Sequence, residues 1–556
     1  MIRALIATLI AAAGGVGSGQ EVVLPNPGFE EIGADGWPTD WHQYNWGPEG
    51  SDGRWQLDPA VAHSGANSVA GISASAAARP GVYTHVPLAA GTYVLGFWAK
   101  AAPGETGLVR CYLATAYSRS HEVTDEWTRV EFRNRLMAPV DGAEINVQSC
   151  SGVRGTVWFD DVSLASAPDL TYETIADPRP LAEQPRLLYF DAHLMSWADA
   201  AQDWRERGFS GAFISGIFGD IHDDPWAADG DATTRGEDDR LLAECRAANA
   251  KCLEAGVDSN VLKVAFYKDL PDPYDDAGYA RITGNFGEAA RFARLAGFPA
   301  IAIDTEYTAY QFDTDWDGYD LAQHPAADLA SRLRERWRDI ARAVLREYPD
   351  VDLMVLPEGA VYYGPLWGDL FSGILEGLAE AEHPGGIHLF CEGSYTNRDP
   401  NGLSEAVADA RETTARRLSP AARDYWDEHG DIALGVWPLG YYRAITDANG
   451  KFLGWSGRQE VFGDRIVGSY ADKSENYPLP EFRLQLAAAR TLSRKYLWVY
   501  GHGSSWWQMT PEENAAYKAR SLQSYPAENY LLPTVPSIAD YYSAAATREV
   551  VRGLGE

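Results

Sequence analysis

The stretch Ala300-Ile-Ala-Ile-Asp-Thr-Glu306 is a short apolar run that ends in two acids. The same arrangement recurs twice along the chain, where Leu353–Leu356 leads to Glu358 and Ile387–Phe390 leads to Glu392. Short apolar runs that alternate with helical segments are typical of parallel strands joined by crossover helices. We therefore expect these acids to lie at strand ends of an α/β domain.

Side chains alternate along a strand, so alternate residues of 300–306 point to opposite faces of the sheet. Asp304 and Glu306 share one face with Ala300 and Ala302, whereas Ile301 and Ile303 point the other way. Two small residues followed by two acids on one face predict that this face lines the inside of a barrel and that the acids lie at its mouth. The isoleucines are expected to pack under the helices.

On both sides of this stretch, the sequence contains further strand-like segments, eight in all, with helical runs between them. The expected strands are Arg186–Asp191, Gly211–Ser215, Asn260–Phe266, Ala300–Glu306, Asp352–Glu358, Gly386–Glu392, Ile432–Leu439 and Tyr496–His502. Helical periodicity is clearest in Ala327–Tyr348, Ser404–Arg417 and Glu481–Lys495, and a further helix is expected at Pro511–Gln523. Eight units in one domain predict a closed (β/α)8 TIM barrel rather than an open sheet.

The first part of the chain has a different pattern. Gly91–Ala99, Trp127–Phe132 and Thr156–Leu164 are rich in β-branched and aromatic residues with a period of two, which predicts an all-β sandwich of jelly-roll type. The expected organisation is therefore a signal peptide at 1–19, a jelly-roll module at 20–168, a linker at 169–182 and the barrel at 183–545. The linker assignment rests on the stiff segment Asp177-Pro-Arg-Pro180.

Length, charge and the N-terminus narrow the range of functions. The 556 residues exceed what one core normally holds, and the net charge of −32 disfavours binding to nucleic acid or anionic lipid. The apolar run Ala4–Ala13 after Arg3 has the layout of a secretory signal peptide and is too short to span a bilayer. We expect a secreted protein, extracellular or periplasmic, without membrane insertion. Nineteen tryptophans and 29 tyrosines make carbohydrate the favoured partner.

Five cysteines are too few for a disulfide scaffold. Cys111 and Cys150 lie in the same module and are candidates for one bridge. Cys245, Cys252 and Cys391 are expected to be core residues.

The active site of a (β/α)8 barrel lies at the C-terminal ends of its strands. Acids end three successive predicted strands, and aromatic or polar side chains follow most of the others. The candidate catalytic residues are Asp304, Glu306, Glu358 and Glu392, and the candidate substrate-binding residues are Asp191, Tyr267, Trp437, His502, Trp506 and Trp507.

Glycoside cleavage needs two carboxyl groups, one to protonate the leaving oxygen and one to attack the anomeric carbon or activate water. We assign Glu306 as the general acid, with Glu392 as nucleophile or base and Glu358 as its substitute. Asp304 is expected to tune Glu306 or to orient a substrate group. The non-catalytic alternative is that a strand-end carboxylate caps a helix or pairs with a buried arginine.

The first module resembles carbohydrate-binding modules of the family 4/9 type. The matching stretches are Leu24–Glu30, Trp37–Trp41, His63–Ser68, Gly91–Ala99 and Val157–Val162, in the family's order. The resemblance implies a structural calcium ion held by Glu30 and Asp161. It also implies sugar stacking by Trp41, Tyr44 and Trp46.

The barrel resembles glycoside hydrolases in outline without matching one family. Asp304-Thr-Glu306 is similar to the end of the strand-4 motif of chitinase-like enzymes, but Ala302 and Pro299 replace the earlier acids of that motif. The sequence thus predicts a secreted glycoside hydrolase that needs no cofactor for catalysis. Two alternatives stay open: a non-catalytic polysaccharide-binding protein with a decayed barrel, and a metal-dependent hydrolase that uses His193, Asp220, His222 and Asp223.

Overall fold

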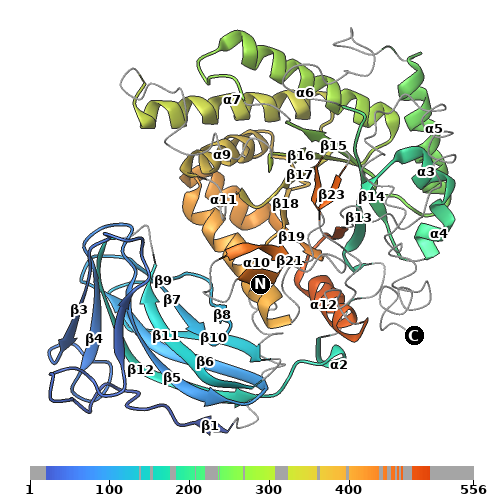
Figure 1. The fold of residues 1–556 in the computed structure, drawn as a ribbon. Coiled ribbons are helices and arrows are strands. Elements are labelled where there is room, and N and C mark those ends of the chain that lie inside the picture. The colour runs from blue at the N-terminus through green and yellow to red at the C-terminus, as the bar shows by residue number, and fades with distance from the viewer. Residues whose placement is uncertain are drawn as a thin grey trace. The chain divides into compact units, whose positions relative to one another are not determined.

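The computed structural model of the chain consists of two compact units that divide between Thr174 and Ile175 (Figure 1). The sequence-based domain bounds, including the linker at 169–182, remain predictions. The residues described are 20–136, 139–150, 154–175, 179, 183–206, 208–218, 236, 238–266, 270–306, 324–359, 364–395, 400–436, 443–446, 452–456, 460–462, 465–467 and 479–500. The predicted signal peptide and the predicted helix at 511–523 lie outside them.

The first unit contains two six-stranded antiparallel sheets. One sheet comprises β1 (Glu21–Val22), β3 (Gly53–Asp58), β4 (Ser68–Ser73), β6 (Gly91–Ala101), β10 (Thr128–Leu136) and β12 (Gly155–Ala167). The other comprises β2 (His42–Asn45), β5 (Pro80–Leu88), β7 (Gly107–Leu113), β8 (Ala116–Tyr117), β9 (His121–Val123) and β11 (Val140–Ser149). A short helix, α2 (Tyr172–Ile175), follows at the division between the units.

One shared core joins these sheets. Phe97 and Phe159 from the first sheet and Val82 and Val147 from the second are fully buried in it. The period of two that the sequence shows is visible along β5, where Val82, Thr84 and Val86 are buried while His85 is exposed. The predicted sandwich is therefore present in the first unit. No disulfide joins Cys111 and Cys150, so the bridge considered for them is not formed.

The second unit is a closed barrel of eight parallel strands. In order around the barrel they are β13 (Arg186–Ala192), β14 (Gly211–Ile214), β15 (Val261–Ala265), β16 (Ala300–Asp304), β17 (Asp352–Leu356), β18 (Ile387–Cys391), β19 (Gly430–Val436) and β24 (Tyr496–Tyr500). Each strand begins within two residues of the position that the sequence predicts. The prediction of eight parallel strands is confirmed.

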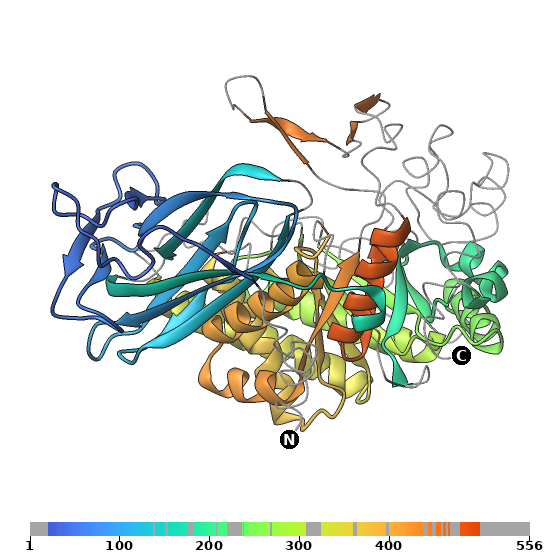
Figure 2. The ribbon, with the colours of Figure 1, turned by 90° about the horizontal axis from the view of Figure 1, so that it is seen from below.

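Helices lie around the barrel wall (Figure 1). They are α3 (Leu194–Asp199), α4 (Ala201–Glu206), α5 (Arg240–Glu254), α6 (Asp276–Ala296), α7 (Ala326–Glu347), α9 (Pro365–Glu380), α10 (Pro400–Arg417), α11 (Pro420–His429) and α12 (Leu479–Leu492). Two short hairpins, β20 (Arg443–Thr446) with β21 (Phe452–Ser456) and β22 (Glu460–Phe462) with β23 (Arg465–Val467), stand outside the wall (Figure 2). Among the helices that can be described, none is long and apolar enough to cross a bilayer.

The alternation along β16 is as the sequence predicts. Ala300 and Ala302 belong to the core inside the barrel, together with Phe213, Phe390 and Trp498. Ile301 and Ile303 belong to the core between the strands and the helices. Small alanines on β16 leave room for aromatic side chains of other strands, and the row of β16 leads up to Asp304.

Candidate functional site

Asp304 ends the inner row of β16 and is neutralised by a lysine. The Nζ of Lys263, on the neighbouring strand β15, lies 3.0 Å from Asp304 Oδ2, and both side chains are buried. Lys263 also lies 4.8 Å from the centre of the Phe190 ring. The ion pair fixes the position of the Asp304 carboxylate at the end of the strand.

The second oxygen of Asp304 holds the residue that follows the strand. Asp304 Oδ1 accepts a hydrogen bond of 3.1 Å from the backbone N–H of Glu306. Glu306 itself is exposed, so its carboxyl group is accessible from the mouth of the barrel. Asp304 therefore supports the backbone at Glu306, and the expectation that it tunes the Glu306 side chain stays a prediction.

Glu358 holds the backbone of Glu392 in the same way that Asp304 holds the backbone of Glu306. It is 1% exposed, and its Oε2 accepts a hydrogen bond of 2.6 Å from the backbone N–H of Glu392. Its Oε1 accepts hydrogen bonds from the N–H of Gly393 at 2.6 Å and from the thiol of Cys391 at 3.2 Å. Burial raises the pKa of Glu358, and the two amide donors oppose that rise. Its contacts leave Glu358 no open face for a substrate, so it does not fit the predicted role of catalytic substitute.

Glu392 lies where several negative charges meet. Burial raises the pKa of Glu392 well above its usual value, and the charge of Glu306 is the next cause, followed by Glu358 and Asp304. Lys263 acts in the opposite direction. The strand ends of β16, β17 and β18 thus place their acids close enough for three of them to act on the pKa of Glu392.

A buried tyrosine adjoins these acids. Tyr395 stacks on Tyr500 with 5.2 Å between ring centres and 10° between planes, and its edge lies against Trp498 at 5.3 Å. Burial and the charge of Glu392 raise the pKa of Tyr395. A Cβ at Gly435 would lie 2.6 Å from the Tyr395 ring, so glycine at that position admits the ring.

Sequence reasoning missed both Lys263 and Tyr395. The alternation along β15 was the available signal for Lys263, because Val261 of the same strand belongs to the inner core. Tyr395 follows Glu392 by three residues in a turn, where no periodicity applies; its N–H bonds to the Glu392 carbonyl.

Several predicted site residues lie outside the described residues. They are Tyr267, Trp437, His502, Trp506 and Trp507, together with Asp220, His222 and Asp223 of the metal alternative. Asp191 lies in β13, but its side chain is not described. His193 is buried where α3 begins. Within the described part of the chain, no cluster of three or more His, Cys, Asp or Glu side chains could hold a metal ion.

The sandwich carries a separate aromatic surface on its second sheet, formed by Tyr44, Trp46 and Tyr83. The ring centres of Tyr44 and Trp46 are 5.0 Å apart, and that of Tyr83 lies 6.5 Å from Tyr44 and 6.0 Å from Trp46. Tyr44 is 53% exposed. His42 and His85 flank Tyr83 at 5.2 and 5.4 Å. Exposed rings on a sheet face give a ligand flat apolar contacts.

A polar row lies beside these rings on the next strands. Asn146 and Gln148 of β11 pair with β5 and β7, and the amide of Gln148 donates to Asn146 Oδ1 at 3.2 Å. Gln148 is fully buried, and its Oε1 has no hydrogen-bond partner among the described residues. Beyond the row, Arg110 lies 4.1 Å above the Tyr117 ring. The polar residues Asn146 and Gln148 thus lie between the aromatic surface and the ring of Tyr117, which Arg110 covers.

Trp41 corrects the sequence prediction. Its side chain is 2% exposed, and its Nε1 donates to the carbonyls of Pro25 and Asn26, each at 3.0 Å. The ring packs edge-on against Phe29 at 5.1 Å. Trp41 is a core residue and has no free face for a sugar. Tyr44 and Trp46 keep their predicted stacking role as a hypothesis.

The proposed calcium ligand Glu30 is already engaged by the loop that follows β3. Its Oε1 accepts hydrogen bonds from the amides of Ala66 at 2.8 Å and Asn67 at 3.1 Å, and its Oε2 accepts from the Asn67 side chain at 3.1 Å. Calcium needs six to eight oxygen ligands. Here the carboxylate oxygens of Glu30 face N–H donors.

The second proposed ligand, Asp161, is engaged in the same way. Its Oδ1 accepts from the Ser64 hydroxyl at 2.7 Å, and its Oδ2 lies 2.6 Å from Nδ1 of His63. The His63 ring stacks on Trp98 at 3.9 Å. Because donors already surround both carboxylates, the residues present do not fit a calcium ion, and no function is derived from one.

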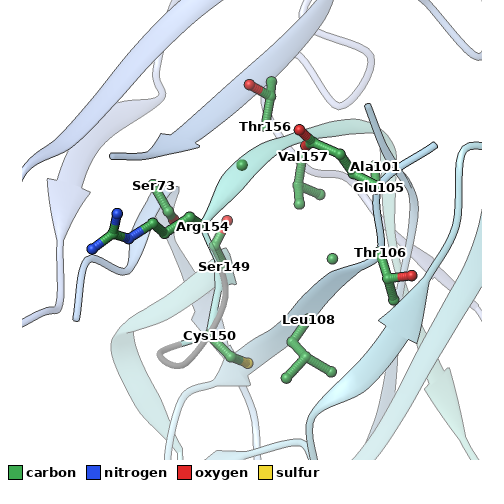
Figure 3. A pocket seen from close by; sticks show the side chains of 12 residues that line it. Ser73, Ala101, Glu105, Thr106, Leu108, Ser149, Cys150, Arg154, Thr156 and Val157 are labelled. Atoms are coloured by element: carbon green, nitrogen blue, oxygen red, sulfur yellow. The ribbon is translucent and has the colours of Figure 1, made fainter. Parts of the chain in front are cut away.

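A narrow pocket opens at one end of the sandwich, where β4, β6, β7, β11 and β12 meet (Figure 3). Ser73, Ser149, Cys150, Glu105 and Arg154 are among its lining residues. The space that the centre of a water molecule can reach is about 10 Å³, which corresponds to roughly one water. The pocket is too small for a sugar ring, so the aromatic surface is the better glycan site in this unit.

Comparisons with known proteins give weak similarities. No family model and no curated protein matches the sequence. Among solved structures, the CBM22-1 xylan-binding domain of Paenibacillus barcinonensis Xyn10C is 13% identical over 28% of this chain and all of that chain, with a TM-score of 0.22. TmCBM61 in complex with β-1,4-galactotriose is 24% identical over 26% of this chain and 97% of that chain, with a TM-score of 0.20.

One neighbour spans both units. The CBM22-1–GH10 modules of Clostridium thermocellum Xyn10B, complexed with xylohexaose, are 13% identical over 92% of this chain and 100% of that chain, with a TM-score of 0.31. At these values the similarity assigns neither a family nor an activity to this chain. Its function has to be inferred from its own residues.

Proposed function

We propose that this protein is an exported glycoside hydrolase whose barrel cleaves a polysaccharide or oligosaccharide and whose sandwich binds the same glycan. One observation carries the proposal: two glutamates follow strand ends on the same rim of the barrel, Glu306 after β16 and Glu392 after β18, and a buried carboxylate holds the backbone N–H of each. The effect of the Glu306 charge on the pKa of Glu392 supports their proximity. Two carboxyl groups of unequal proton affinity are what glycoside cleavage requires.

The surroundings of the two acids support this assignment. Asp304 and Glu358 hold the backbone N–H groups of the two glutamates, so the supporting carboxylates and the proposed catalytic carboxyl groups are different residues. Tyr395 and Trp498 are buried core side chains beside the acids, so the sugar contacts are expected from other residues at the mouth. The alternative of a decayed barrel predicts no hydrolysis, and the experiment below decides between the two.

The glycan-binding part of the proposal rests on the aromatic surface. Adjacent strands lie about 4.8 Å apart, so the face from β2 across β5, β11 and β7 to β8 is roughly 19 Å wide. Asn146 and Gln148 on this sheet are fully buried, so the exposed ring of Tyr44 is the contact expected for a sugar. We expect a neutral chain to be bound there, because the net charge of −32 repels anionic polymers.

The experiment for the barrel is hydrolysis of a panel of neutral polysaccharides, namely xylan, mixed-linkage β-glucan, galactan, mannan and starch. The wild-type protein is expected to release reducing ends from at least one of them. Glu306→Gln and Glu392→Gln are each expected to lower that rate by about 10²- to 10⁴-fold. The matched control is Glu288→Gln, which alters a buried glutamate paired with Arg291 on α6. Hydrolysis that is unchanged in both mouth variants would refute the site.

The experiment for the sandwich is retention of the protein on an affinity gel that contains the hydrolysed polysaccharide. Tyr44→Ala is expected to weaken retention several-fold, because it removes an exposed ring without disturbing the core. Tyr274→Ala, which removes a tyrosine in the second unit, serves as the control. Equal retention of the Tyr44 variant and the wild type would remove the aromatic surface from the proposal.

A further inference from the structure

The two supporting carboxylates at the barrel mouth differ in one respect. Asp304 is paired with the ammonium group of Lys263 at 3.0 Å, so this support carries little net charge. Glu358 is held by two amides and a thiol, which are neutral donors. Each support accepts the backbone N–H of one glutamate, Asp304 for Glu306 and Glu358 for Glu392.

Burial raises the pKa of Glu358, and its hydrogen bonds oppose that rise. All three groups in contact with it donate hydrogen bonds, which a carboxylate accepts with both oxygens, so these contacts favour the ionised form. Burial and then the charge of Glu358 raise the pKa of the Cys391 thiol, which keeps that thiol a donor. Among the described residues, the charge of Asp304 is opposed by Lys263, whereas neutral donors hold Glu358.

Resting on the proposed function, we propose that Glu392 donates the proton to the leaving oxygen, that Glu306 is the ionised partner, and that Glu358 is the positioning residue that maintains this division. This reverses the roles expected from the sequence alone. The charged groups that face Glu392 are Glu306 and Asp304 from β16, Glu358 from β17 and Lys263 from β15. Burial and the three like charges raise the pKa of Glu392, in agreement with the assignment.

The proton and electron pairs balance as follows. The proton of Glu392 moves to the glycosidic oxygen while the bond from that oxygen to the anomeric carbon breaks and leaves its electron pair on the oxygen. If water attacks, its oxygen bonds to the anomeric carbon and its proton passes to Glu306. If Glu306 attacks, its oxygen forms the new bond, and water later releases the sugar and returns a proton to Glu392. Glu392 is the first donor in both cases.

The direct test compares two substrates of the sugar that the polysaccharide panel identifies: its oligosaccharide and its dinitrophenyl glycoside. Dinitrophenolate leaves without a proton, so a missing general acid matters little for that substrate. Glu392→Gln is expected to lose about 10²- to 10⁴-fold on the oligosaccharide and less than tenfold on the aryl glycoside. Glu306→Gln is expected to lose activity on both. Retention of aryl-glycoside activity by Glu306→Gln instead of Glu392→Gln would overturn the assignment.

The positioning role of Glu358 is tested by the pH dependence of kcat/KM. Glu358→Gln is expected to move the basic limb of the profile down by about one pH unit, because a like charge beside the acid is removed. Lys263→Met is expected to move the same limb upward, because it uncovers the charge of Asp304. A purely structural role would lower the rate and leave the limb in place, and Glu288→Gln is the control for a buried glutamate elsewhere.

Failure of the proposed function and failure of the positioning role of Glu358 give different results. If the wild-type protein hydrolyses no member of the panel, the proposed function fails. If it hydrolyses a substrate but neither Glu358→Gln nor Lys263→Met moves the basic limb, the positioning role fails while the function stands.

Discussion

The two ends of the barrel use charged residues in opposite ways. At the N-terminal ends of the strands, acids are paired with basic or phenolic groups: Asp352 with Lys495 at 2.7 Å and with the Tyr496 hydroxyl at 2.6 Å, Asp258 with Arg186 at 3.0 Å, and Asp431 with His388 at 3.2 Å. At the C-terminal ends, Asp304 is paired with Lys263, while burial and the charges of Glu306 and Glu358 raise the pKa of Glu392. Ion pairs suit a structural role at one end, and a carboxyl group with a raised pKa suits proton transfer at the other.

Breaking the ion pair between Lys263 and Asp304 at the mouth is expected to have the largest effect on stability. Lys263→Met leaves Asp304 buried without its cation, which costs about 3–5 kcal/mol in the free energy of unfolding. The double variant Lys263→Met with Asp304→Asn is expected to regain much of this loss, because no buried charge is then left unpaired. Urea unfolding of the wild type and the variants measures both. Equal stability of the single and double variants would contradict the pairing.

Asp352, a paired acid at the N-terminal end of the barrel, is expected to affect stability and not activity. Asp352→Asn weakens two hydrogen bonds with Lys495 and one with Tyr496, which is expected to cost about 1.5–3 kcal/mol. The rate of polysaccharide hydrolysis is expected to stay unchanged at a temperature where the variant is folded. A selective loss of activity in the folded variant would show that the N-terminal end takes part in catalysis.

The mouth acids are expected to lower stability as the pH rises. Since the pKa of Glu392 is raised in the folded state, that state binds more protons than the unfolded chain above the ordinary pKa of glutamate, and the free energy of unfolding falls with pH. Glu392→Gln removes this dependence, so its stability relative to the wild type is expected to grow from pH 5 to pH 8. Urea titrations at both pH values provide the measurement. A constant difference would contradict the raised pKa.

The acids of the sandwich form a third group, and the smallest effect is expected there. Glu30 and Asp161 already accept hydrogen bonds from the loop at 63–67, so a chelator is expected to leave the melting temperature unchanged. A calcium site filled to a hundred times its Kd would stabilise the protein by about 2.7 kcal/mol. A clear rise in melting temperature on adding calcium would show that the loop rearranges around the ion.

The positions of the barrel strands and the direction of their acids can be predicted from the sequence, but the contacts of each acid cannot. Strand positions follow from apolar runs, and the inward direction of Ala300, Ala302 and Asp304 follows from alternation, so the barrel and the direction of its acids are predictable. What an acid contacts is not predictable in this way. Glu358 and Glu392 have the same local pattern, yet one is enclosed by amide and thiol donors from the next strand and the other is not.

The errors elsewhere have the same origin. Trp41 follows Asp40, which has a left-handed φ of 65°, so no strand period tells which way the indole points. It turned out to face the core, while Tyr44, three residues later in β2, faces outward. Lys263 was overlooked because a lysine within a strand suggests a solvent-facing side chain until its partner on the adjacent strand is known.

At the barrel mouth, Glu392 rather than Glu306 is proposed to hold the proton that is transferred. Infrared difference spectroscopy of the wild type against Glu392→Gln at pH 7 reports the protonation state of this group. The carbonyl band of a protonated carboxylic acid is expected to be lost in the variant, whereas the same comparison with Asp352→Asn is expected to show the loss of an ionised carboxylate. Loss of only an ionised carboxylate band in Glu392→Gln would refute the assignment.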